Sequence, residues 1–242
     1  MSAYNETPDK RIRADFALRI GKLFSGYEKK LASLEAEDQF DATLTLVLLQ
    51  SLLTTCSELM NKKPYDDYFD QQLVQVPALW GLRSDMVVRN TFPEKLTYKL
   101  VIDRVRNALS HPTYGDVEHK YPVSGFKNIN DSDGNIWGFS FVNSPDIKHE
   151  GSVESFGESE AGRKLAERRK GITKASGEQV LELSKKENGK FVICCCGEPY
   201  VRIFQMAVPM TALKSLLLGL SNYLAQPTQN CWDGKSITQL VA

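Results

Sequence analysis

The segment Arg106-Asn107-Ala108-Leu109-Ser110-His111 brings together a guanidinium, a carboxamide and an imidazole. An arginine side chain stays charged at any physiological pH and fits phosphate oxygens as a fork, while histidine gives or takes a proton near neutrality. RNA cleavage needs both abilities, because a base must deprotonate the ribose 2′-hydroxyl while a cation stabilises the charge that grows on the phosphate oxygens. We therefore single out Arg106 and His111 as candidate catalytic residues.

A single amphipathic helix from about Pro93 to Ser110 is predicted to carry this segment. Its apolar residues recur at helical spacing, namely Leu96, Leu100, Val101, Val105, Ala108 and Leu109. Arg106 and Asn107 fall outside that apolar stripe. The pairs Arg106/Ser110 and Asn107/His111 are i,i+4 neighbours, so the candidate site consists of two adjacent polar stripes.

The residue after the motif sets where the imidazole lies. Pro112 disfavours helical geometry at His111, so His111 is expected at the helix terminus, where it can turn toward a cleft. Asn107 is then placed to orient the imidazole or the substrate, and we count it as a third catalytic candidate.

Three more polar side chains on this helix are candidate substrate contacts: Ser110, Arg104 and Lys99. Lys99 lies within about 20° of Arg106 on the helical wheel, so it could add a phosphate contact. Surface placement without function is the alternative for Lys99 and Arg104. Asp103 precedes Arg106 by three residues, and an intrahelical ion pair that only steadies the guanidinium is the alternative to catalysis.

The pattern Arg106-Asn107-x3-His111 at the end of a helix resembles the signature of the HEPN superfamily. Members of that family are mostly RNA-cutting, and their motif is Arg, four to six residues and His, commonly with a polar residue directly after the Arg. The resemblance covers about Arg11 to Pro112 and the C-terminal helix. It implies a bundle of four or five helices that forms a homodimer, in which two motifs share one composite, metal-independent active site.

The order of elements further resembles the toxin-like, plasmid-encoded branch of HEPN proteins, because a β-rich segment precedes the last helix. This resemblance implies a toxin or anti-phage defence effector, with an antitoxin or another defence protein as partner. A sub-branch paired with nucleotidyltransferase antitoxins carries Tyr two residues after the His; here Thr113 stands there and Tyr114 follows. The alternative function is a catalytically inactive HEPN module that binds RNA or nucleotide, or serves as a structural partner.

The composition of the chain bears on how it could bind RNA and on where in the cell it is expected. The chain has 242 residues, 42% of them hydrophobic, and 30 basic side chains balance 30 acidic ones. RNA affinity must therefore come from a local patch and not from the net charge. The most apolar run, Leu44 to Leu53, is about half the ~20 residues that span a bilayer, and the polar N-terminus lacks a signal-like segment, so we expect a cytoplasmic protein without membrane contact.

The cysteines give no sign of a metal site. The five cysteines include the triplet Cys194-Cys195-Cys196, but Cys-x2-Cys pairs and His-x3-His spacing are missing, which argues against zinc. Buried small side chains are the simpler interpretation of the triplet. We expect neither a metal nor another cofactor.

Periodicity predicts a single α+β domain over residues 1–242, mostly α, with a helical bundle in 10–115 and 207–226 and a β-rich insertion in 121–206. Besides the motif helix, amphipathic patterns predict helices over Lys10–Glu37, Asp41–Lys62 and Pro209–Leu224. Hairpins are predicted over Phe126–Val142, turning at residues 131–135, and over Gln179–Cys196, turning at 187–190, with a further strand in Tyr200–Met206.

Three aromatic residues of the first hairpin allow two interpretations. Trp137, Phe139 and Phe141 alternate as the inward residues of a half-buried strand do, which favours core packing. A platform on which RNA bases stack is the alternative.

Overall fold

The computed structural model describes residues 8–35, 40–57, 60, 73, 80–92, 94–110, 123–147, 181–185, 191–195, 198–199 and 201–225; for residues 8–11 and 181–199 it describes the backbone alone. The described part contains four α-helices: α1 (Pro8–Leu31), α2 (Asp41–Cys56), α4 (Tyr98–Ser110) and α6 (Met210–Ala225). Each of the four predicted helices has a counterpart, but α2 ends at Cys56 instead of the predicted Lys62, and α4 begins at Tyr98 instead of about Pro93. α1 ends six residues before the predicted Glu37, where the backbone turns through a hydrogen bond from Ser33 to Lys30 of 2.8 Å.

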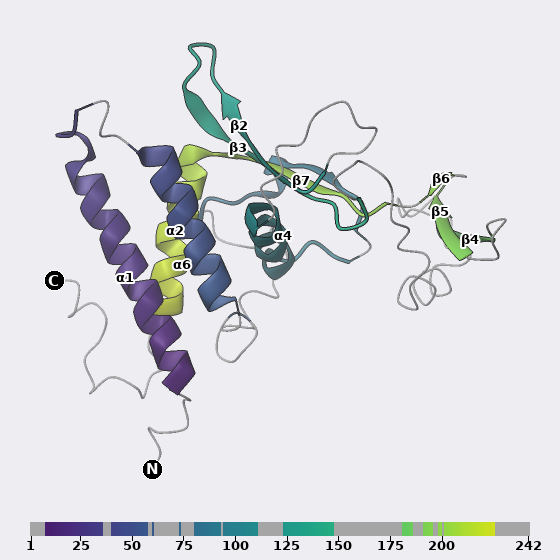
Figure 1. Ribbon diagram of the computed structural model, residues 1–242, viewed down its shortest axis with the longest axis horizontal. Coiled ribbons are helices and arrows are strands. Elements are labelled where there is room, and N and C mark those ends of the chain that lie inside the picture. Colours follow the sequence, from purple (N-terminus) through teal and green to yellow (C-terminus); the bar gives the residue numbers. More distant parts are fainter. Residues whose placement is uncertain are drawn as a thin grey trace.

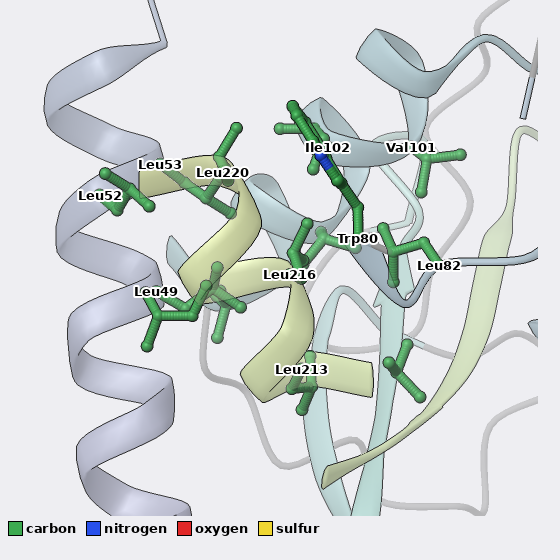
Figure 2. Packing of buried hydrophobic residues seen from close by; sticks show 14 of the residues in the cluster. Leu49, Leu52, Leu53, Trp80, Leu82, Val101, Ile102, Leu213, Leu216 and Leu220 are labelled. Atoms are coloured by element: carbon green, nitrogen blue, oxygen red, sulfur yellow. The ribbon is translucent and has the colours of Figure 1, made fainter. Parts of the chain in front are cut away.

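Helices α1, α2 and α6 run side by side as a three-helix layer (Figure 1). Leucine side chains fill the space between α2 and α6, and Figure 2 shows Leu49 and Leu53 of α2 beside Leu216 and Leu220 of α6. These side chains are buried because α2 and α6 are apolar on the sides that meet. No helix in the described ranges is long and apolar enough to cross a membrane.

A four-stranded antiparallel sheet lies beside this layer. Its strands are β1 (Val87–Asn90), β2 (Gly125–Asn130), β3 (Ile136–Asn143) and β7 (Phe204–Pro209), in the order β1-β7-β3-β2. Strands β4 (Leu181–Lys185), β5 (Phe191–Cys195) and β6 (Glu198–Pro199) form a separate sheet. Figure 1 draws this second sheet away from the helices.

The turn between β2 and β3 has the geometry that its residues predict. Asp131 accepts hydrogen bonds from the backbone N–H groups of Asp133 and Asn135, both at 2.9 Å, and Gly134 adopts a positive φ of 85°. Such side-chain-to-backbone bonds and a left-handed glycine close short hairpin loops. The predicted first hairpin is confirmed; strands β4 and β5 agree with the second, whose turn at 187–190 lies outside the described residues.

Helix α4 packs against the sheet and against α2, so it lies between the two layers (Figure 1). The sheet face toward α4 carries Phe139 and Phe141 of β3, which pair with Val208 and Met206 of β7. Both phenylalanines are fully enclosed, which confirms core packing and excludes them from a stacking platform. Trp137 of the same strand is 48% exposed.

Trp80 joins α4 to α6. Its ring meets Tyr98 of α4 and Tyr223 of α6 edge to face, each with ring centroids 5.1 Å apart, and Figure 2 places it among Ile102, Val101 and Leu216. The next residue, Gly81, has a φ of 79°, and a Cβ at that position would lie 2.5 Å from the backbone oxygen of Ala212. The Trp80–Gly81 segment can therefore approach α6 only with glycine at position 81.

We expect Gly81→Ala to lower the free energy of unfolding by at least about 1–2 kcal/mol, because it adds left-handed strain and a clash with α6 backbone. Gly26→Ala is the matched control: Gly26 is an exposed residue of α1, and a Cβ added there would have nothing within 4 Å. Because alanine is the better helix former at that position, Gly26→Ala should raise the free energy of unfolding by about 0.5–1 kcal/mol. Urea denaturation of both variants measures the two changes, and equal effects would contradict this account.

The structure differs from the predicted division of the chain in two places. β1 falls inside residues 10–115, which were predicted to be helical, and β7 continues to Pro209, beyond the predicted end of the insertion at 206. Val87 of β1 pairs with Met206 of β7, so the sheet combines strands from both predicted parts. The fold is mixed α+β, with strands inserted before the last helix as predicted.

Candidate active site

Helix α4 begins at a capping threonine. The backbone N–H of Leu100 donates to Thr97 Oγ1 at 3.3 Å, which satisfies one of the free N–H groups of the first turn. The buried side of α4 carries Tyr98, Val101, Ile102, Val105, Ala108 and Leu109. Packing of this stripe against sheet and α2 fixes the rotation of the helix about its axis, and Gln50 of α2 adds a 3.3 Å hydrogen bond to the Leu109 carbonyl. Arg106 and Asn107 consequently lie on the partly open side.

Arg106 is accessible and loosely held. Its side chain is 31% exposed; Nη2 donates to Asn107 Oδ1 at 3.3 Å, and Nη1 lies 3.9 Å from Asp103 Oδ1. The predicted i,i+3 ion pair is therefore present, but at the long end of the range. A guanidinium has five N–H donors, so these two contacts leave most of its donors for a phosphate.

Asn107 contacts Arg106 in this structure, and its carboxamide oxygen is the acceptor. Ser110 is exposed, and its hydroxyl donates to the Arg106 carbonyl at 2.9 Å, a bond within the helix. Lys99 is half-buried, and its side chain makes no hydrogen bond or ion pair with the residues that the structure describes. His111 lies outside the described residues, and α4 ends at Ser110, the residue directly before it.

The guanidinium of Arg104 lies apart from that of Arg106. Two residues along a helix correspond to about 200°, so the two guanidiniums leave α4 on nearly opposite sides. Arg104 lies over the Phe92 ring, with Cζ 3.8 Å from the ring centroid. Burial lowers the pKa of Arg104, and Arg202 lowers it further, against the raising effects of Glu94 and Asp103. The side chain remains a cation, because arginine keeps its proton in proteins.

A second arginine, which the sequence pattern did not single out, approaches the same ring. Arg202 Cζ lies 5.7 Å from the Phe92 centroid, and its guanidinium binds Asp146, with Nη2 to Oδ1 at 2.6 Å and Nε to Oδ2 at 3.0 Å. The backbone N–H of Arg202 also donates to Asp146 Oδ2 at 2.8 Å. The one signal in the sequence was a charged residue between Val201 and Ile203, which are both buried.

The candidate site thus divides into two parts on one helix. Arg106, Asn107 and Ser110 share the open side at the end of α4, while Arg104 stands with Phe92 and Arg202 near the sheet. In the described ranges, no three His, Cys, Asp or Glu side chains gather into a group that could hold a metal ion. Comparisons with protein-family models, with curated proteins and with solved structures gave no match.

Proposed function

We propose that this protein is a metal-independent endoribonuclease of the HEPN type. Arg106 supports this proposal best. Its guanidinium is partly exposed, most of its N–H donors are not used by Asn107 or Asp103, and it lies near the end of α4, a helix packed against the sheet and α2. In the sequence, His111 directly follows Ser110, the last residue of α4, and supplies the proton-transfer group of the motif. The resemblance of Arg106-Asn107-x3-His111 to the HEPN signature assigns that pair to RNA cleavage.

In the proposed reaction the ribose 2′-oxygen attacks the adjacent phosphorus and the 5′-oxygen of the next nucleotide leaves. His111 takes the proton from the 2′-hydroxyl or gives one to the leaving 5′-oxygen. Arg106 neutralises the charge on the non-bridging oxygens, which is greatest in the transition state. Asn107, already in contact with Arg106, orients the guanidinium or the substrate. The products are a 2′,3′-cyclic phosphate and a 5′-hydroxyl.

End-group analysis tests this chemistry directly. The protein is incubated in EDTA with an RNA pool, and the products are treated with a kinase that labels 5′-hydroxyl ends or with acid that opens cyclic phosphates. We expect the 5′ ends of the products to be labelled without prior phosphatase treatment and their 3′ ends to be sensitive to acid. Fragments that carry 5′-phosphates would contradict the proposed reaction.

The proposal includes a C2 homodimer. One motif offers one imidazole, whereas the reaction uses a base and an acid, and two motifs brought together supply both. We expect light scattering to give a molar mass near twice the 27.2 kDa of the chain under conditions in which the protein cuts RNA. An active monomer at the assay concentration would exclude the shared site.

A toxin or anti-phage defence effector is the biological role that fits such an enzyme, with an antitoxin or defence-system protein as its partner. Expression in bacteria should then be toxic, and His111→Ala should relieve the toxicity. Toxicity that persists in this variant would separate the role from the cleavage chemistry.

One observation favours the second candidate, an inactive HEPN module that binds RNA or acts as a structural partner. Asp103 already lies beside Arg106, so the guanidinium has an intrahelical role that needs no substrate. The two candidates differ in their dependence on His111. Stable RNA binding that His111→Ala leaves unchanged, without cleavage by either protein, would favour the module.

A further inference from the structure

The Phe92 ring lies where helix α4 meets the ends of three strands. Phe92 follows β1, Arg202 precedes β7 and Asp146 follows β3, while Arg104 reaches the ring from α4. Two cations therefore meet one aromatic residue that is 9% exposed. The carboxylate of Asp146, itself 3% exposed, is committed to Arg202 through its side chain and its backbone N–H. This cluster of Phe92, Arg104, Arg202 and Asp146 is called the Phe92 cluster below.

Arg104 is held differently from Arg202. It stacks on Phe92, and within the described residues its guanidinium has neither a hydrogen-bond acceptor nor an ion-pair partner. The contact with the ring face holds the guanidinium in place without an oxygen acceptor, so its N–H donors stay available for an anion. Donors that are partly removed from water gain from an acceptor that carries charge.

The surrounding charges favour an anion. Arg104 and Arg202 repel each other, Asp146 offsets Arg202, and Asp103 lies beside Arg106. Glu94 and Asp103 are the carboxylates that act on Arg104, and among the described residues neither forms an ion pair with it. An incoming anion therefore competes for the Arg104 fork only with Glu94 and Asp103, neither of which is bonded to it in the described part of the chain.

We propose that Arg104 binds a phosphate of the RNA backbone other than the one that is cut. This inference rests on the proposed function, and it names a second contact with the same substrate. Arg104 and Arg106 lie on opposite sides of a helix that is about 10 Å across, so one phosphate cannot reach both guanidiniums. A strand can reach both, because it carries one phosphate per nucleotide. A strand that passes the end of α4 is then fixed at two points.

Binding of a non-cleavable RNA measures this contact apart from catalysis. A short 2′-O-methyl RNA with a fluorescent label is titrated with the full-length protein, and anisotropy is recorded at several salt concentrations. Arg104→Gln is expected to weaken binding about tenfold and to reduce the slope of log K against log salt by about 0.7, the value for one phosphate of a single strand. Arg104→Lys should fall between, because it keeps the charge and loses the fork.

Matched variants separate this effect from folding and from net charge. Arg19→Gln removes the same charge from the exposed surface of α1, where Arg19 pairs with Asp15, and it should bind RNA as the wild type does. Glu94→Gln removes one competing carboxylate and should tighten binding, and this gain should disappear when Arg104→Gln is also present. Wild-type affinity and salt slope in folded Arg104→Gln would overturn the proposal.

Two outcomes distinguish this proposal from the proposed ribonuclease function and from the binding of a free phosphate ligand. If Arg104→Gln weakens binding but the wild type never cuts RNA, the phosphate contact stands and the proposed function fails. Inorganic phosphate and ATP are also tested for their effect on the melting temperature. An Arg104-dependent rise with either, while RNA binding does not depend on Arg104, would assign the fork to a free phosphate ligand and overturn the RNA assignment.

Discussion

Arg106→Ala and His111→Ala are each expected to lower the rate of RNA cleavage in EDTA by about two to four decades. Arg106 contributes charge that the transition state needs most, and His111 contributes the proton transfer. The stability of Arg106→Ala should change little, because a partly exposed i,i+3 pair at 3.9 Å from Asp103 contributes only about 0.2–1 kcal/mol. A large loss of rate with a small change in stability is the signature of a catalytic arginine.

Arg19→Ala is the matched control for Arg106→Ala, since Arg19 also pairs with an aspartate of its own helix, at 2.7 Å from Asp15. It should cut RNA at the wild-type rate. Asp103→Ala tests the alternative role of Arg106: if the ion pair only holds the helix, Asp103→Ala and Arg106→Ala should have equal effects. Undiminished cutting by both Arg106→Ala and His111→Ala would end the ribonuclease assignment.

Asp146→Ala is expected to lower the free energy of unfolding by about 3 kcal/mol. The change leaves the Arg202 guanidinium without the carboxylate that binds it at 2.6 and 3.0 Å, and it removes the acceptor of the Arg202 backbone N–H. Removal of one partner of an enclosed ion pair is costly because the other charge stays poorly solvated. Urea denaturation measures the loss.

The control is Asp85→Ala, because Asp85 pairs with Arg83 at 3.0 Å while both side chains are more than half exposed. Water screens that pair, so its removal should change stability by less than about 1 kcal/mol. Similar losses in the two variants would show that Asp146 contributes no more than a surface carboxylate. Asp146→Asn, which keeps one acceptor oxygen, should recover part of the loss.

Local signals explain what could be predicted from the sequence. The leucines of α2 and α6 recur at helical spacing, and the turn at Asp131 consists of residues that bond to their own backbone. The open side of α4 was predictable for the same reason, since Arg106 and Asn107 interrupt an apolar stripe. The observed start of α4 at Tyr98 could also have been predicted, because threonine, here Thr97, is a residue type that caps the first turn of helices.

Long-range pairing explains what could not be predicted. β1 has only four residues, three of them exposed, so no alternation marks it as a strand. It is a strand because β7 lies beside it, and the pairing continues as Thr91 exchanges hydrogen bonds with Ile203. The Phe92 cluster has the same origin. Its members come from four segments, and no spacing in the chain indicates that they meet.

The position of β7 late in the chain has a consequence for the order of events during synthesis. The sheet on which α4 packs has two inner strands, β7 and β3, and β7 separates β1 from β3 and directly precedes α6. A nascent chain that already contains α4 and the β2–β3 hairpin that packs against it still lacks the complete sheet, because β1 and β3 have no common neighbour until residues 204–209 leave the ribosome. Pairing of Val87 with Met206 also closes a long loop, which is slow. The sheet beside the motif helix is therefore completed only when most of the chain has been made.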